Sequence, residues 1–141
     1  MTYTRGNYPL PPADDGDLET PYTVDDNTKV AAHDYPTLDM VPQSATDEYA
    51  IHEFKVDATG KSTVDIEWVG RSNIDCSHST VYLQIYDYTE VLGVDVGWTT
   101  IYSDTLTAAG TDISLVFSIP DLGPYKDANG IITCRVFQEA K

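Results

Sequence analysis

The sequence has few basic residues and no long apolar run. Its 141 residues include 8 Lys and Arg against 23 Asp and Glu, which gives a net charge of −15. So acidic a chain repels polyanions and anionic bilayers, and we therefore expect neither nucleic acid nor a charged membrane surface as a partner. No apolar stretch approaches the roughly 20 residues that span a bilayer. The first residues (MTYTRGNYP) also have no apolar core of a secretory signal.

Cysteine and histidine are equally scarce. Cys76 and Cys134 are far apart, without Cys-x-x-Cys spacing, which argues against zinc and dithiol chemistry. We interpret Cys134 as a small buried hydrophobe and Cys76 as a loop thiol, with a disulfide between them as the alternative. Among the three dispersed histidines, His78 lies between Ser77 and Ser79, but no Gly-x-Ser-x-Gly motif is present. No catalytic residue is assigned, and we expect a protein that is not an enzyme.

The N-terminal third differs in composition from the rest. Six of the eight prolines lie in the first 50 residues: Pro9, Pro11, Pro12, Pro21, Pro36 and Pro42. Proline interrupts helices and cannot donate a hydrogen bond within a sheet. We therefore predict an extended arm over residues 1–46, with room for one or two strands such as a short edge strand, and a folded domain over residues 47–141.

Large apolar side chains recur along this arm, unlike the Gly/Ser-rich composition of flexible linkers. The candidate contact residues are Tyr3, Tyr8, Leu10, Tyr22, Tyr35 and Leu38. A Pro-rich extended segment loses little conformational entropy when it binds along a surface. The arm is therefore predicted to dock on a neighbouring subunit or scaffold. Packing on its own domain and a mobile arm are the alternatives.

From residue 47 onward, short apolar runs alternate with turn residues. Strands are predicted at residues 49–56, 62–69, 80–89, 98–103, 111–119 and 131–138. Their period of two and their β-branched and aromatic residues indicate half-buried antiparallel strands. The expected inward-facing residues are Val64, Ile66, Trp68, Val81, Leu83, Ile85, Ile113, Leu115, Phe117, Ile119, Ile132, Cys134 and Val136. The pattern predicts an all-β fold, an antiparallel β-sandwich with jelly-roll or Greek-key wiring, and no amphipathic helix.

Aromatic side chains gather on the opposite face of one predicted strand. Tyr82, Tyr86 and Tyr88 project from it, with Trp98 in the loop at its far end. Aromatic rings supply contact area at low entropy cost, so these four residues are candidates for a sheet-face contact with a subunit or a glycan. A second layer of core is the alternative.

The arm contains an acidic cluster. Asp15, Asp17 and Glu19 are spaced like the first half of a calcium loop. Thr20 and Pro21 follow where such a loop needs a glycine, so a solvated acidic arm is the preferred interpretation. Calcium stays an alternative, and no cofactor or metal ligand is assigned.

A succession of short segments in the second half resembles a known class of module. The run 81–89 (VYLQIYDYT) is followed by 97–101 (GWTTI), 109–115 (AGTDISL), 125–130 (YKDANG) and 132–137 (ITCRVF). This succession resembles jelly-roll, galactose-binding-like β-sandwich modules of phage and prokaryotic surface proteins. The matching motifs are structural, because the Trp packs a corner and the Tyr-x-Asp turn precedes the last hairpin. The resemblance implies a β-sandwich fold and a place in a phage or prokaryotic surface protein. It carries over no catalytic residue.

Two functions from different classes are consistent with these features. The first is a structural virion or surface-assembly protein, of the capsid decoration or head-accessory type. It would lie on the particle exterior in many copies and bind capsid or other neighbouring subunits through its arm and sheet face. The alternative is a carbohydrate-binding module, extracellular or on the cell surface, that uses Trp98 and the tyrosines, with or without calcium. An open aromatic platform favours the second function, and a platform covered by an arm favours the first.

Overall fold

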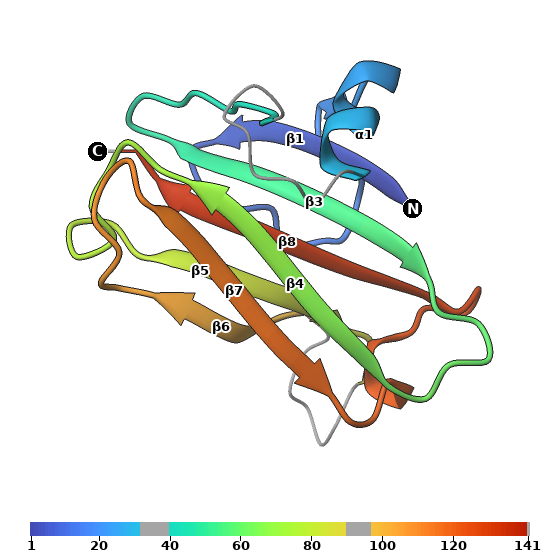
Figure 1. The fold of residues 1–141 in the computed structure, drawn as a ribbon. Helices are drawn as coiled ribbons and strands as arrows, with labels where there is room; N and C mark the ends of the chain where they lie inside the picture. Colours follow the sequence, from blue (N-terminus) through green and yellow to red (C-terminus); the bar gives the residue numbers. More distant parts are fainter. Residues whose placement is uncertain (32–39, 90–96, 141) are drawn as a thin grey trace.

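A computed structural model describes residues 1–31, 40–89 and 97–140, which form an antiparallel β-sandwich (Figure 1). The elements in chain order are β1 (Thr2–Tyr8), β2 (Thr20–Pro21), α1 (Val24–Ala31), β3 (Tyr49–Asp57), β4 (Val64–Arg71), β5 (Val81–Asp87), β6 (Gly97–Asp104), β7 (Asp112–Ile119), the 3-10 turn η2 (Gly123–Tyr125) and β8 (Ile131–Glu139). None of the described helices is long and apolar enough to cross a membrane.

The strands form two sheets of unequal size. The larger has the order β2-β1-β3-β8-β5-β6, and the smaller consists of β4 and β7. The pairs are nested along the chain, because β3 pairs with β8, β4 with β7 and β5 with β6. The β4–β7 pair lies across only part of the six-stranded sheet, in front of β8 and β5 (Figure 1). One face of the large sheet, here called the inner face, is turned toward β4 and β7, and the other is the outer face.

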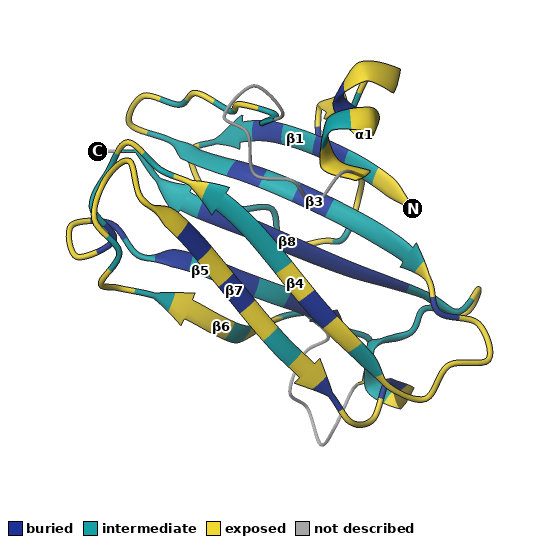
Figure 2. Cartoon of the chain, viewed as in Figure 1, coloured by how far each residue is buried: buried dark blue, intermediate teal, exposed yellow. Residues whose placement is uncertain are grey.

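The six strands predicted after residue 47 are confirmed, with ends shifted by two residues or fewer. Alternation also places the core correctly. Leu83, Ile85 and Leu115 are fully buried between the sheets, and the remaining residues expected inward belong to the same cluster. The period-two pattern is reliable here because β4 and β7 bury one face and leave the other in water. Their exposed outer residues are visible in Figure 2.

Both cysteines are free and buried in this core. Cys134 is the small buried hydrophobe that was expected. Cys76 is not an accessible loop thiol, since only 1% of its surface is exposed. Burial raises the pKa of both thiols, so neither is an activated nucleophile.

The prediction of no helix is wrong over one short segment. Thr23 and Asp26 form a reciprocal cap at the start of α1, where Thr23 N donates to Asp26 Oδ2 at 3.0 Å and Asp26 N donates to Thr23 Oγ1 at 3.1 Å. This capping box, together with the Asp25–Lys29 ion pair at 2.7 Å, supports two turns of helix. The helix lies over the inner side of β1 and β3, which β4 and β7 leave uncovered (Figure 1).

The described part of the arm packs on its own domain, rather than extending away from it. β1 pairs with β3 along seven residues, from Thr2 opposite Lys55 to Tyr8 opposite Tyr49. The arm therefore contributes a strand to the large sheet, one position in from the edge, with β2 outside it. The sequence allowed for an edge strand, and packing on the same chain is the alternative that the structure shows.

Candidate functional site

The outer face of the six-stranded sheet is the most distinctive surface of the protein. An antiparallel sheet with one solvated face has polar, exposed residues there. Here β8 places Thr133, Arg135 and Phe137 on that face, and all three are buried. On the neighbouring β3, Ile51 and Glu53 are also buried. The outer face is therefore covered, and the segment that covers it belongs to the N-terminal arm.

Residues 9–19, here called the strap, leave the end of β1, cross the outer face and return to β1. Arg135 Nη1 on β8 donates to Pro12 O at 2.6 Å. Trp98 Nε1 on β6 then donates to Asp14 O at 3.1 Å. The strap therefore reaches the far edge of the sheet within six residues of Tyr8. Two backbone carbonyls hold it there, so the contact does not depend on the identity of those strap side chains.

Two carboxylates tie down the next part of the strap. Tyr88 Oη donates to Asp15 Oδ2 at 2.5 Å, and Lys55 Nζ contacts Asp17 Oδ1 at 2.8 Å. Burial of Tyr88, together with its hydrogen bond to Asp15, raises the pKa of the phenol well above its usual range. Tyr88 therefore stays a proton donor at any physiological pH. These acids, which were considered as calcium ligands, instead act as hydrogen-bond and ion-pair acceptors for the sheet.

Leu18 anchors the strap where it returns to β1. Its side chain is buried against Ile51 and Phe137, and its amide donates to Thr4 Oγ1 at 3.1 Å. The next amide, that of Glu19, donates to Tyr8 Oη at 3.0 Å. Full burial of a leucine side chain contributes roughly 1.5–3 kcal/mol. Leu18 is thus the main apolar contact of the strap.

Arg135 lies at the centre of the outer face and organises it. Its guanidinium carbon is 3.9 Å from the centroid of the Trp98 ring, and its Nε donates to Gln84 Oε1 at 2.9 Å. Burial lowers the pKa of Arg135 to about 10, so the group stays charged at neutral pH. A buried guanidinium that stacks on Trp98 and binds Pro12 O joins the sheet, the aromatic cluster and the strap.

Glu53 is the least satisfied polar group among the described residues. It lies opposite Arg135 on β8 and opposite Thr4 on β1, with 2% of its surface exposed. Its Oε1 has no hydrogen-bond partner and is 3.8 Å from Lys55 Nζ. Burial raises the pKa of Glu53 to about 7, and the nearby Asp17 adds to the shift, while Lys55 and Arg135 oppose it. Below about pH 7, the strap therefore covers a neutral carboxyl group.

The residues predicted as arm contacts fall into four groups. Tyr8 packs beside Leu18 on the outer face. Tyr3 and Tyr22 instead stack on each other on the inner side of β1, with ring centroids 5.3 Å apart. Leu10 is 74% exposed and contributes little to burial. Tyr35 and Leu38 lie outside the described residues.

Three of the four predicted sheet-face aromatics, Tyr86, Tyr88 and Trp98, are brought together, and other residues of the chain cover most of their surface. Tyr86 is buried and contacts Tyr88 and Trp98, with ring centroids at 4.9 and 5.2 Å. Tyr82 lies apart from this group and stacks on Phe137 at 5.2 Å. The strap and Arg135 cover Trp98 and Tyr88. These aromatics therefore do not form an open platform.

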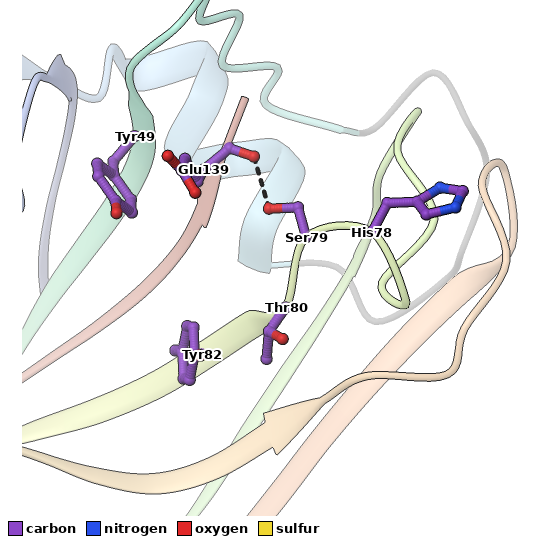
Figure 3. A pocket seen from close by; sticks show the side chains of 6 residues that line it. All are labelled: Tyr49, His78, Ser79, Thr80, Tyr82 and Glu139. Atoms are coloured by element: carbon purple, nitrogen blue, oxygen red, sulfur yellow. Dashed lines mark hydrogen bonds between the residues drawn. The ribbon is translucent and has the colours of Figure 1, made fainter. Parts of the chain in front are cut away.

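Tyr82 also borders a pocket of about 190 Å³ at one end of the outer face (Figure 3). Tyr49 and Thr80 line it too, and Ser79 Oγ closes one side by donating to the backbone oxygen of Glu139 at 2.6 Å. His78 points away from the other side chains in the close-up. Because Ser79 bonds to a backbone carbonyl and His78 faces solvent, the pocket contains no paired serine and histidine.

Sequence reasoning missed the inner-side group at His52. Tyr22 Oη and His52 Nδ1 are 2.5 Å apart, and the two rings meet edge to face with centroids 5.9 Å apart. Burial, together with the positive charge of Arg5, lowers the pKa of His52 to about 4. The imidazole is therefore neutral at physiological pH, and it fixes the arm on this side of the sheet.

The described residues contain no group of three or more His, Cys, Asp or Glu side chains positioned to hold a metal ion. No protein-family model matches the chain, and it has no significant similarity to any curated protein or solved structure in the comparisons.

Proposed function

We propose that this chain is a non-enzymatic structural protein of a virion or another surface assembly, and that it binds neighbouring subunits. The observation that carries the proposal is the strap. The largest aromatic surface of the sandwich is built to hold an extended segment, and it does so through two backbone carbonyls, two carboxylates and one buried leucine. Such a surface suits a protein that fastens chains together.

Two further features support this setting. The nested strand pairs of the sandwich support the proposed jelly-roll wiring, which is that of the phage and prokaryotic surface modules that the sequence resembles. The net charge of −15 keeps the outer surfaces soluble and mutually repelling. In this proposal the protein acts as a capsid decoration or head-accessory component on the exterior of the particle. It is present in many copies and stabilises a shell by adding buried interface area.

Carbohydrate binding is the second candidate, and the pocket beside Tyr82 and Tyr49 is the feature that favours it. Aromatic side walls suit the flat face of a sugar ring. We place it second because a platform built from Trp98, Tyr86 and Tyr88 needs the strap to move away first. The strap of the same chain therefore already covers the larger part of the aromatic surface.

The test is sedimentation of the protein from its native source through a density gradient, with the chain identified by mass spectrometry. We expect the chain in a fast-sedimenting particle fraction, in many copies per particle, and resistant to a high-salt wash. The wash is the control for adventitious adsorption of an acidic protein. Recovery only as a slow-sedimenting free chain would contradict the proposal.

A further inference from the structure

We propose that neighbouring copies exchange their arms, so that the arm of one chain occupies on a second copy the place that it occupies on its own sheet. This inference rests on the proposed function and names the partner, which is a second copy of this chain. Among the described residues the exchanged unit comprises 1–31 and 40–44, and the joint is residues 45–47.

The sheet needs an arm, but the contacts do not require that arm to belong to the same chain. Ile51, Phe137 and Arg135 are buried where Leu18 and the strap lie on the outer face, together with the neighbouring tyrosines Tyr8, Tyr49 and Tyr82. The seven β1–β3 pairs are likewise contacts between segments separated by about 40 residues or more. An arm from a second copy forms the same hydrogen bonds and ion pairs at the same positions. Exchange therefore loses none of these contacts.

Residues 42–44 belong to the moving unit, because they bond to β1. Arg5 Nη1 donates to Pro42 O at 2.7 Å, and Gln43 Nε2 donates to Asn7 Oδ1 at 2.6 Å. The side chain of Asn7 also donates to Ser44 O. These hydrogen bonds lie within the arm, so they would stay intact when the arm moves from its own sheet to a second copy.

Glu48 belongs to the stationary unit. Its carbonyl accepts a hydrogen bond from Ala140 N at 2.8 Å, and β3 begins at the next residue. The joint between the two units is therefore only three residues long. When residues 45–47 straighten, the arm is carried away from its own sheet and toward a neighbour.

The joint is strained in the unexchanged form. Asp47 has φ 55°, and it is the only non-glycine residue with positive φ in the described parts of the chain. A side-chain-bearing residue is disfavoured in this left-handed region, and the strain is released when the joint opens into an extended conformation. A short joint under strain is the condition that favours exchange of an element between identical chains.

Charge makes the exchanged contact selective. Two copies of a chain with net charge −15 repel each other over most of their surface. The outer face is different because it presents Lys55 and Arg135, which bind Asp17 and the Pro12 carbonyl of the strap. An arm from a second copy thus meets the positive charges of Lys55 and Arg135 at this face, beside Glu53, whose raised pKa reduces its negative charge.

The experiment uses two variants of the full chain that each carry one added cysteine, Thr2→Cys and Lys55→Cys, with one of them carrying a tag that changes its mass. Lys55→Cys removes the ion pair to Asp17, so the exchange that it reports rests on the remaining contacts of the arm. These positions are opposite each other in the β1–β3 pair. The native thiols do not interfere, since both are buried. The variants are mixed at high concentration and oxidised, and covalent heterodimers are measured. The double variant in one chain shows that the pair forms a disulfide when the arm is seated.

The matched control is a mixture of Glu67→Cys and Val116→Cys chains, which are an exposed opposite pair within the β4–β7 sheet. Exchange predicts heterodimers of the arm pair several-fold above this control. It also predicts a several-fold lower yield when both arm-pair chains carry Asp47→Gly, because glycine accepts positive φ without strain.

Two results would overturn the exchange. In one, oligomers form, but the arm-pair heterodimers stay at the level of the control. In the other, Asp47→Gly leaves the heterodimer yield unchanged or raises it. Neither result bears on the proposed function, which is judged separately by sedimentation of native particles.

Discussion

Substitution of Glu53 or of His52 is expected to give opposite pH dependences of stability. The two residues are adjacent on β3 and face opposite sides of the sheet. Between about pH 5 and pH 7, the free energy of unfolding should rise with pH in Glu53→Gln and fall with pH in His52→Gln. In the unaltered protein the two contributions oppose each other over this range, so its profile should be flatter than that of either variant.

The signs follow from the two pKa shifts. Glu53 has a pKa of about 7 in the folded protein against 4.5 when free, so the native state binds the extra proton, and stability falls as pH rises between those values. His52 has a pKa of about 4 against 6.5, so the unfolded state binds the extra proton and stability rises with pH. Each contribution is on the order of 2 kcal/mol across the measured range. Aspartates whose pKa is lowered, such as Asp26 and Asp104, titrate below this range.

Urea denaturation at several pH values gives the required free energies. The comparison is between the slopes of the two variants, because either substitution also changes packing by an amount that does not depend on pH. A flat profile in His52→Gln, the variant that keeps Glu53, would show that Glu53 is solvated rather than buried under the strap.

Leu18→Ala is expected to loosen the strap without unfolding the sandwich. Leu→Ala at a buried site costs about 2–4 kcal/mol. The substitution should lower the free energy needed to open the strap rather than that of unfolding the sandwich. The reason is that Leu18 packs at the outer surface of the sheet and not between the sheets. The amide of Glu19, which donates to Tyr8 Oη, should then exchange its hydrogen roughly 30- to 1000-fold faster.

Leu10→Ala is the matched control. Leu10 lies in the same segment but is 74% exposed, so its removal should leave the exchange of Glu19 unchanged. Hydrogen exchange followed by NMR resolves the single amide. If both variants exchange like the unaltered protein, Leu18 does not anchor the strap.

The sandwich was predictable from the sequence because its strands have one solvent-exposed and one buried face. Val64, Ile66 and Trp68 alternate with Asp65 and Glu67, and the structure turns the first three inward. Local alternation fixes both the strand and its orientation. The helix was missed because it is only eight residues long and lies in a Pro-rich region, although Thr23 and Asp26 carry a capping-box signal.

The strap was not predictable in its details, because most of the contacts that hold it join segments distant in sequence. Arg135 and Pro12 are 123 residues apart, and Trp98 and Asp14 are 84 apart. Two of the hydrogen-bond acceptors are backbone carbonyls. Every residue has one, so the residue type does not show which of them accepts. One signal was present in β8, where outward positions hold Thr133, Arg135 and Phe137. Only Phe137 among them is apolar, and an aromatic residue on the outward face of an antiparallel strand indicates that the face is covered at that position.

The most direct test of the account is whether the strap lies on the outer face in solution. The measurement is a nuclear Overhauser experiment on the unaltered chain at low concentration, between the Leu18 methyl groups and the Phe137 ring, together with exchange of the Trp98 indole proton. The account predicts a strong Leu18–Phe137 effect and slow exchange at Trp98, because the strap covers both residues. No Leu18–Phe137 effect and a Trp98 proton that exchanges as fast as in a free indole would contradict it. The aromatic face would then be open, and carbohydrate binding would become the better proposal.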